Sequence, residues 1–549
     1  MLASHHILTS ALADHQAGHL HRAADGYRKA LSIEPANPDA LHLLGLTERG
    51  DGRPGQALRL MERSLVTQPA LFPACFNLAR LHHSLGRLDD AEALLRRAWA
   101  LSPSRDLAVT LASVRLERGH DGAAEQAART ALMLEPADSR TLGTMALALN
   151  RAGAGDDVVL RTYARACRAA PDQGDIWVNR AAALLARGQA EGARRSAAMA
   201  RVLLPGDAGA LINHANALQT LGRLEEAFTA YEAAQAADPL RGEARMGLAN
   251  TLSRLVPQWH APMMNDAVRN DAYEAALRRA VGPDTHVLEI GTGAGLLALM
   301  AAAAGARRVT TCEMVAPVAA AARDIVAANG LADRITVIPR RSDALDADSD
   351  LGGRADVLVS EILSSELLSE GVLPSLEDAQ ARLLKPGGTV IPRAGALRCA
   401  LVGGRFLEDH FETAAIKGFD VRRFRRLVAR RAYMQAGAAD CTRLSAVFEP
   451  FHFDLTGRTR TVPEQRRVAV PVTAGGRCLG VLQWIRLEMD AHTLFENDPA
   501  DRQPVSGWQP VIYLFDAPVT VRTGQTVMLQ AWHNRNQPWF MLDGVTQAR

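Results

Sequence analysis

Residues 285–306 read THVLEIGTGAGLLALMAAAAGA, and this stretch decides the fold of the second half of the chain. The apolar positions of THVLEI predict a buried parallel strand, and LLALMAAAA predicts a helix that packs against it. Gly291, Gly293 and Gly295 lie in the turn between them, where glycine lets the backbone approach a ligand and leaves amide groups near a helix amino terminus. A GxGxxG dinucleotide fingerprint needs glycine at position 296, where Leu296 stands, which counts against NAD or FAD.

Further strands follow this turn, each with polar side chains near its end. RRVTTCEM ends in Glu313, 24 residues after Glu289, where a carboxylate can accept from both hydroxyls of a ribose. RITVIPR leads to Ser342 and Asp343, which are placed to meet an adenine edge. ADVLVSE ends in Glu361, and LLKPGGTVI predicts a fifth strand. Acidic residues end strands in any doubly wound sheet, so each feature alone is weak.

In this order, and with the pattern E-x-G-x-G-x-G, the features resemble the class I S-adenosylmethionine-dependent methyltransferases. The resemblance implies a Rossmann-like α/β domain over residues 251–395 and S-adenosylmethionine as the methyl donor. It assigns donor binding to Glu289, Gly291, Gly293, Gly295, Glu313, Ser342 and Asp343.

Residues 360–377, SEILSSELLSEGVLPSLE, carry Glu361, Glu366 and Glu370 at a strand's carboxyl end, where such sheets place their active sites. Three carboxylates on a loop are also compatible with a solvated surface. Two glutamates nine residues apart resemble the signature of the protein arginine methyltransferases, and SSELLSEGVLPS is most similar to the branch with types 7 and 9. The resemblance implies that Glu361 and Glu370 are catalytic and hold the acceptor guanidinium.

Upstream, WHAPMMNDAVRN (259–270) resembles the family's helix that closes over the donor. It implies that His260 and Met263 face the donor and that Arg269 pairs with its carboxylate; Asp266 also fits the motif. Downstream, residues 396–549 contain alternating stretches such as RVAVPV and resemble the family's substrate-binding β-barrel. Within it, GFD at 418–420 resembles part of the arm through which these enzymes dimerise, so a homodimer is expected.

Two features depart from the family. The aromatic helix with paired tyrosines is not evident in TLSRLVPQW, and the Thr-His-Trp loop aligns with Ser506, Gly507 and Trp508, so its histidine is missing. We expect Trp508 to form an apolar wall of the acceptor pocket and Gly507 to leave a gap that lowers turnover. The alternative is that His533 takes over the histidine's role.

The first 240 residues contain a repeat. Prolines recur every 33 to 35 residues, and a glycine precedes most of them by 17 residues, which predicts helical hairpins that stack into a solenoid. The prolines are Pro35, Pro69, Pro103, Pro136, Pro171, Pro205 and Pro239. The pattern resembles about seven tetratricopeptide repeats over residues 1–250, which implies a groove for peptides or partner proteins. The alternative is that the array only stabilises or dimerises the enzyme.

Composition limits the other function classes. The chain has 62 Lys and Arg residues against 60 Asp and Glu, so no global field favours nucleic acid or a membrane surface. No apolar run reaches the roughly 18 residues that a membrane helix needs. Six scattered cysteines argue against a disulfide scaffold or a metal site, and a reducing cytoplasm is the expected location.

The sequence therefore predicts a multidomain protein arginine N-methyltransferase that uses S-adenosylmethionine, with an all-α solenoid before the α/β domain and a β-barrel-like substrate domain after it. Two alternatives stay open. One is a repeat scaffold with a weak or inactive methyltransferase domain, and the other is a methyltransferase for a non-arginine acceptor.

Overall fold

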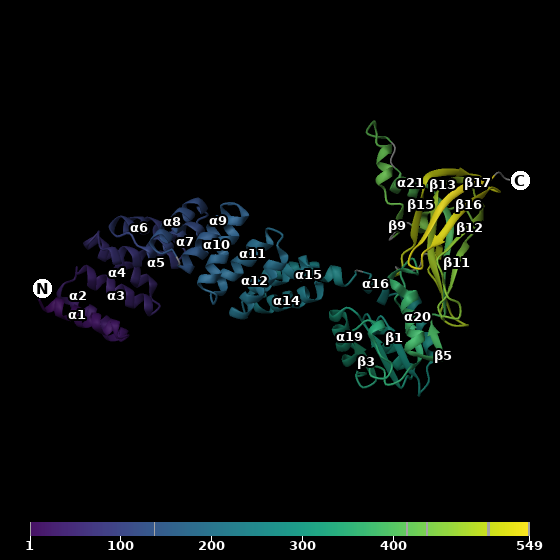
Figure 1. Cartoon of the computed structure of the whole chain (residues 1–549), viewed down its shortest axis with the longest axis horizontal. Coiled ribbons are helices and arrows are strands. Elements are labelled where there is room, and N and C mark those ends of the chain that lie inside the picture. Colours follow the sequence, from purple (N-terminus) through teal and green to yellow (C-terminus); the bar gives the residue numbers. More distant parts are fainter. Residues whose placement is uncertain are drawn as a thin grey trace. The chain divides into compact units, whose positions relative to one another are not determined.

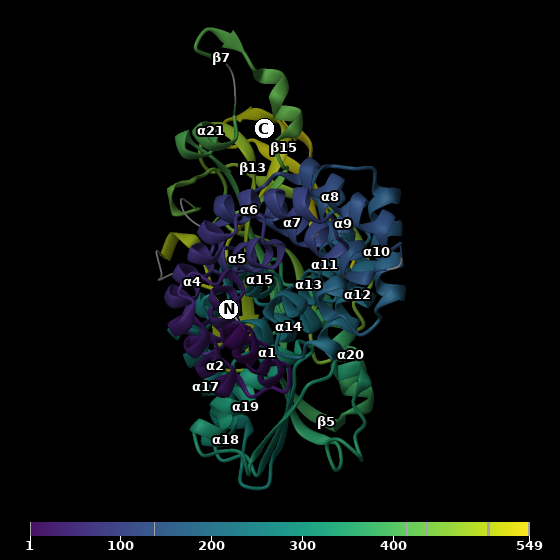
Figure 2. The same ribbon diagram turned by 90° about the vertical axis from the view of Figure 1, so that its left-hand side faces the viewer.

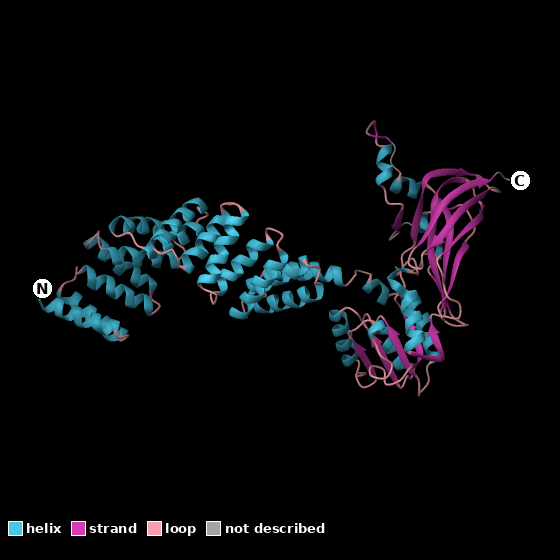
Figure 3. Cartoon of the chain, in the orientation of Figure 1, coloured by secondary structure: helices cyan, strands magenta, loops and turns pink. Residues whose placement is uncertain are grey.

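The computed structural model describes residues 2–136, 138–257, 259–412, 415–434, 438–501 and 506–546. The chain divides into two compact units, residues 1–252 and residues 253–549 (Figure 1). The first unit is helical and the second contains the strands, as the colouring in Figure 3 shows. None of the described helices is long and apolar enough to cross a membrane.

Helices of the first unit pack in sequence as antiparallel hairpins. The turns within the hairpins hold glycines with φ between 69° and 79°, namely Gly18, Gly52, Gly86, Gly119, Gly153, Gly188 and Gly222. A side chain at such a φ is strained, so the glycine period seen in the sequence is the period of these turns. The expected solenoid of helical repeats is confirmed. Its helices are α1 (Leu2–Gln16), α2 (Leu20–Ile33), α3 (Pro38–Gly50), α4 (Pro54–Thr67), α5 (Phe72–Ser84), α6 (Leu88–Leu101), α7 (Arg105–Glu117), α8 (Asp121–Leu134), α9 (Ser139–Arg151), α10 (Asp156–Ala169), α11 (Gly174–Leu185), α12 (Ala190–Leu203), α13 (Ala208–Thr220), α14 (Leu224–Ala237) and α15 (Gly242–Leu255).

The second unit begins with a parallel sheet in the order β3-β2-β1-β4-β5. The strands are β1 (His286–Ile290), β2 (Arg308–Cys312), β3 (Ile335–Ile338), β4 (Ala355–Ser360) and β5 (Leu384–Ile391). The helices are α16 (His260–Met264), α17 (Ala267–Ala280), α18 (Leu296–Ala303), α19 (Ala316–Ala328) and α20 (Val372–Arg382), with short turns η1 (Ser342–Ala344) and η2 (Ser369–Gly371). Because the strands are parallel, the loops after β1, β2, β3 and β4 meet at one edge of the sheet. The Rossmann-like fold is confirmed.

An antiparallel β domain follows. One sheet runs β10-β6-β13-β15-β9, with β11 beside β6 and β14 beside β13, and a second sheet runs β12-β16-β17. The strands are β6 (Ala394–Gly403), β9 (Arg431–Tyr433), β10 (Thr442–Arg443), β11 (Phe448–Asp454), β12 (Glu464–Pro471), β13 (Gly476–Glu488), β14 (Leu494–Glu496), β15 (Val511–Val521), β16 (Thr526–His533) and β17 (Pro538–Thr546). One apolar core joins this domain to the parallel sheet, so the loop after β4 is held between them.

A short arm interrupts the β domain. It comprises α21 (Arg405–Phe411), the paired strands β7 (Ala415–Ile416) and β8 (Phe419–Asp420), and the turn η3 (Arg422–Leu427). Its tip, labelled β7 in Figure 2, projects from the β domain. The turns η4 (Ala438–Asp440) and η5 (Pro499–Asp501) complete the second unit.

Candidate active site

A cavity of about 370 Å³ lies at the carboxyl edge of the parallel sheet. We call it the donor cavity. It brings together six of the residues that the sequence assigned to donor binding, from α16 and from the loops after β1, β2 and β3. They are His260, Met263, Gly291, Gly293, Glu313 and Ser342.

Gly291 and Gly293, in the loop after β1, are glycines for different structural reasons. A Cβ atom on Gly291 would stand 2.6 Å from Ile362 Cγ2, and φ there is +85°, so both space and backbone require glycine. A Cβ on Gly293 would meet no atom within 4 Å, so Gly293 leaves open room beside the cavity. The backbone NH of Gly293 donates to Glu313 Oε2 at 3.2 Å, and Val315 NH donates to Glu313 Oε1 at 2.9 Å. Glu313 is therefore fixed at the end of β2.

Four predicted donor residues lie outside the lining of this cavity. Gly295 caps the start of α18 with φ +81°. Asp343 is half-exposed and forms an ion pair of 3.0 Å with Arg341, which itself lines the donor cavity. Glu289 is buried beneath the glycine turn, and burial raises its pKa to about 8. Arg269 is buried as well, directly behind Glu361.

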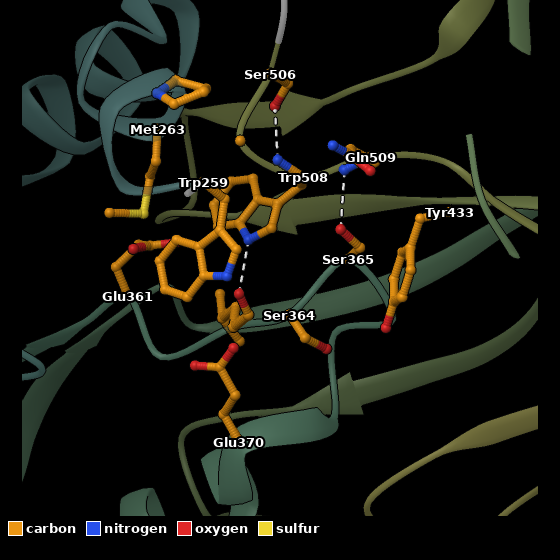
Figure 4. A pocket seen from close by; sticks show the side chains of 13 residues that line it. Trp259, Met263, Glu361, Ser364, Ser365, Glu370, Tyr433, Ser506, Trp508 and Gln509 are labelled. Atoms are coloured by element: carbon orange, nitrogen blue, oxygen red, sulfur yellow. Dashed lines mark hydrogen bonds between the residues drawn. The ribbon is translucent and has the colours of Figure 1, made fainter. Parts of the chain in front are cut away.

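A second cavity, of about 580 Å³, adjoins the donor cavity, and we call it the acceptor cavity (Figure 4). The two cavities share four lining residues, which are Trp259, Met263, Glu361 and Glu370. In Figure 4, Trp259 lies near both carboxylates while Tyr433 faces them from the other side. Both glutamates of the predicted pair therefore stand where the two cavities meet.

The two carboxylates have different surroundings. The Glu361 side chain is 7% exposed, and its Oε2 lies 3.3 Å from Arg269 Nη1. Burial raises the pKa of Glu361 to about 8, although the Arg269 charge opposes the rise. Glu370 is exposed toward the cavity and has φ +68°. Partial burial also raises the pKa of Glu370, and the charge of His260 opposes that rise.

Glu366, the third of the glutamates considered on this loop, has a structural role. It is fully buried and accepts hydrogen bonds from Tyr513 Oη at 2.8 Å and Arg431 Nη1 at 3.1 Å. A buried carboxylate with such partners anchors the loop to the β domain rather than facing a ligand. The loop thus uses one glutamate for its own support and presents two to the cavities.

The loop at residues 506–509 forms the opposite wall of the acceptor cavity. Trp508 is buried there, and its Nε1 donates to Leu363 O at 2.6 Å. The expected gap at Gly507 is wrong, because a Cβ atom on Gly507 would stand 2.7 Å from Met263 Cβ. Met263 occupies the space that a side chain at position 507 would need.

His533 does not replace the missing histidine, because it lines neither cavity. It lies in β16, buried between Phe451 and Phe453, with ring centroids 4.7 and 5.1 Å away. Burial lowers its pKa, so the ring is neutral in its aromatic surroundings.

Trp259, Met314 and Tyr433 are among the lining residues that carried no predicted role. Trp259 lines both cavities, and its ring stacks on His260 with centroids 4.3 Å apart. In the sequence, its position next to His260, which was expected to face the donor, could have indicated this role. Met314 follows Glu313 directly and lines the donor cavity. Tyr433 comes from β9, far from every motif, and nothing in the sequence pointed to it.

Comparisons with known proteins find methyltransferases and tetratricopeptide repeats. A family model of ribosomal protein L11 methyltransferase matches residues 274–398, and tetratricopeptide repeat models match residues 48–113 and 208–239. The chain is 39% identical over 280 residues to an arginine N(omega)-methyltransferase of Streptomyces achromogenes subsp. streptozoticus, an alignment that covers 50% of this chain and 76% of that protein.

Eukaryotic proteins are also similar to the chain. It is 30% identical over 313 residues to protein arginine N-methyltransferase 7 of Danio rerio, which covers 52% of this chain and 45% of that protein. For the enzyme of the same name from Oryza sativa subsp. indica, the identity is 34% over 253 residues, with coverages of 42% and 35%. The chain therefore spans less than half the length of these two relatives. A solved structure, the Trypanosoma brucei PRMT1 enzyme-prozyme complex with AdoHcy, matches with a TM-score of 0.45 and 23% identity, covering 51% of this chain and 88% of that one.

Proposed function

The chain belongs to the arginine N-methyltransferase family, and from this premise we propose that it transfers a methyl group from S-adenosylmethionine to a guanidinium nitrogen of arginine in protein substrates. One observation carries the proposal. The donor cavity and the acceptor cavity meet at two carboxylates, Glu361 and Glu370, which a planar cation such as guanidinium can bridge.

The residues around the donor cavity fit S-adenosylmethionine, which supplies an electrophilic methyl group when bound. Glu313 has both oxygens oriented by backbone NH groups and can still accept from ribose hydroxyls. Arg269 lies outside the cavity lining and pairs with Glu361, but its buried Nη1 has no hydrogen-bond partner among the described residues and could still donate to a carboxylate of the donor. Gly293 leaves room for a close approach, and the apolar Met263 lies where the two cavities join.

Glu361 and Glu370 would orient the acceptor. Two carboxylates can accept charge-assisted hydrogen bonds from one guanidinium and draw its positive charge away from the reacting nitrogen. The guanidinium loses a proton in the reaction, and the carboxylate of Glu361, which the bound guanidinium keeps ionised, can accept that proton. Trp508 excludes water from one side of the cavity.

The lining of the acceptor cavity supports an arginine within a protein rather than the free amino acid. Among its described lining residues there is no Lys, Arg or His that could pair with an α-carboxylate. The nearby Arg431 is engaged by buried Glu366. Rates with free L-arginine and with an arginine peptide, measured on the same protein, test this choice, and faster methylation of the free amino acid contradicts it.

The decisive experiment separates donor binding from transfer. Glu370→Gln and Glu361→Gln keep the side-chain volume but lose the charge, so we expect methyl transfer to fall on the order of 100-fold with donor affinity nearly intact. Glu377→Gln is the matched control, because Glu377 pairs with Arg535 and lines neither cavity. Donor titration by calorimetry, labelled-methyl turnover and residue-level mapping of the product provide the readouts. Wild-type transfer by Glu370→Gln would remove the arginine assignment.

The solenoid is proposed to recruit a partner with an acidic segment. A cavity of about 420 Å³ on it is lined by Phe76, Arg80 and Arg140 among others, and Arg80 lies over the Phe76 ring at 5.9 Å. In the described part of the chain neither Arg80 nor Arg140 has an ion-pair partner, whereas Arg105 in the same lining has three. Charge reversal at Arg80 and Arg140 should weaken methylation of full-length substrates and leave peptide methylation unchanged.

The arm is proposed to mediate a homodimer. It exposes Ile416, Phe419, Phe424 and Leu427, each more than half accessible, within one short segment. Apolar groups gathered in this way are typical of an interaction surface. Phe419→Asp together with Leu427→Asp should shift the molar mass in light scattering from dimer to monomer, and an unchanged mass contradicts the proposal.

A cytoplasmic location is also proposed. Cys75, Cys167, Cys312, Cys399 and Cys478 are buried as free thiols, which fits a reducing compartment. Fractionation of the native cells tests it.

A further inference from the structure

Ser506 lies where the β domain contacts α16 and α17, which we call the lid helices. Its hydroxyl donates to Asp266 Oδ2 at 2.7 Å and accepts from the backbone NH of Trp508 at 3.2 Å. Figure 4 shows the second of these bonds on the wall of the acceptor cavity. Asp266 is 8% exposed, so its carboxylate depends on such partners.

Asp266 connects Ser506 to the catalytic pair. Its Oδ1 accepts from the backbone NH of Arg269 at 3.0 Å and caps the start of α17. The Arg269 guanidinium, on the first turn of that helix, lies 3.3 Å from Glu361. The cap therefore fixes the helix turn from which Arg269 reaches Glu361.

Trp508 connects Ser506 to the glutamate loop from the other side. Its indole donates to Leu363 O at 2.6 Å, and the next residue, Gln509, donates its backbone NH to Ser365 Oγ at 2.8 Å. Leu363 and Ser365 lie between Glu361 and Glu370. The Ser506 hydroxyl thus joins two paths of contacts that end on the same loop.

Gly507 adds a second contact between the loop at 506–509 and α16. Its lack of a side chain lets the backbone of the loop approach Met263. A histidine at that position has no room beside Met263. The connection between the acceptor wall and the lid is made by the serine hydroxyl next to it.

We propose that Ser506 is a positioning residue for methyl transfer. Its hydroxyl holds the loop at 506–509 against α17 through Asp266 and so fixes the position of Glu361 relative to the acceptor. The proposal rests on the proposed function. It concerns geometry, since the Ser506 hydroxyl contacts no reacting group directly.

Ser506→Ala tests the proposal, with kcat, the acceptor KM, the donor Kd and the melting temperature measured on one preparation. We expect kcat/KM for an arginine peptide to fall about 10-fold, with most of the loss in kcat and little change in donor Kd or melting temperature. Ser506→Thr keeps the hydroxyl and should restore the rate. Ser349→Ala is the matched control, because Ser349 donates to Asp346 at 3.1 Å on an exposed loop outside both cavities.

The outcomes separate the two proposals. If wild type methylates arginine and Ser506→Ala is as fast, or if Ser506→Thr is as slow as alanine, the positioning role is overturned while the function stands. If wild type binds the donor but methylates no arginine, the proposed function fails. For a Ser506→Ala protein that does not fold, Asp266→Asn supplies the same test, because it keeps the side-chain size but weakens the acceptor for Ser506; an unchanged rate again overturns the proposal.

Discussion

Glu361 and Glu370 form one pair, and among the described residues only Glu361 has an arginine in ion-pair contact. Arg269 faces Glu361, while Glu370, Glu289 and Asp266 add negative charge around it, and burial dominates their sum. The pKa of Glu361 in the ligand-free protein is therefore about 8, well above that of an ordinary glutamate. An acceptor guanidinium supplies the positive charge that favours ionisation.

Acceptor binding should consequently release a proton. At pH 7 most Glu361 side chains are protonated, and the guanidinium binds the ionised form, so we expect release of about one proton per site. The proton shows as a dependence of the calorimetric enthalpy on the ionisation enthalpy of the buffer. Raising the pH from 7 through 8 should strengthen binding and reduce the release. Glu361→Gln binds without this proton, and identical enthalpies in all buffers for wild type would show that Glu361 is already ionised.

Titration of the buried Glu289 should make the stability of the protein, rather than its binding, depend on pH. Its Oε2 is buried and has no hydrogen-bond partner among the described residues, and its folded-state pKa of about 8 lies above the ordinary value of 4.5. The folded state then holds the proton more tightly than the unfolded chain. Its contribution to stability is complete below pH 4.5 and disappears as the pH rises through 8.

Glu289→Gln should therefore flatten the pH dependence of unfolding. The amide keeps the size and cannot ionise, so we expect the free energy of unfolding of the variant to exceed that of wild type by up to a few kcal/mol at pH 9 and to be close to it at pH 4. Urea unfolding at both pH values measures the difference. If the free energy of unfolding changes with pH by the same amount in the two proteins, the raised pKa of Glu289 is contradicted.

At the scale of elements, the loop at 506–509 and the lid helix α16 are fitted to each other. The contact between Gly507 and Met263 is made by residues from opposite ends of the second unit. A larger side chain must displace Met263, which lines both cavities.

Gly507→His should therefore lower activity, although it restores the family's loop sequence. Overpacking at this contact typically costs 1–3 kcal/mol, and displacement of Met263 should weaken donor binding as well as transfer. Donor calorimetry and peptide turnover of Gly507→His measure the effect, with Gly544→Ala as a control for glycine replacement outside both cavities, because a Cβ atom on Gly544 would meet no atom within 4 Å. A faster Gly507→His enzyme would show that the lid yields and that the missing histidine limits the rate.

The same elements show what the sequence could predict. Turn glycines and strand order follow local rules, so the solenoid period and the parallel sheet were predicted, and Glu313 and Ser342 lie at the expected strand ends. The direction of a side chain depends on neighbours that no local pattern encodes. Asp343 pairs with Arg341 and does not line the donor cavity, and Met263 fills the space at Gly507.

At the scale of the whole molecule, one boundary separates two cores. The parallel sheet and the β domain share a single apolar core, and both cavities are lined only by residues of the second unit. The solenoid has its own clusters of buried residues within and between repeats. Folding of the second unit does not require the repeats on this account.

Deletion of residues 1–241 tests this independence and keeps all of α15, whose Leu255 lines the donor cavity. We expect the remaining chain to bind the donor and to methylate short arginine peptides at nearly the wild-type rate, because both cavities are intact. Full-length protein substrates should be methylated more slowly, since recruitment through the solenoid is lost. Paired measurements on a peptide and on the protein that contains it distinguish the effects. Equal losses on both substrates would mean that the solenoid supports the enzyme structurally, and the recruitment proposal would then be abandoned.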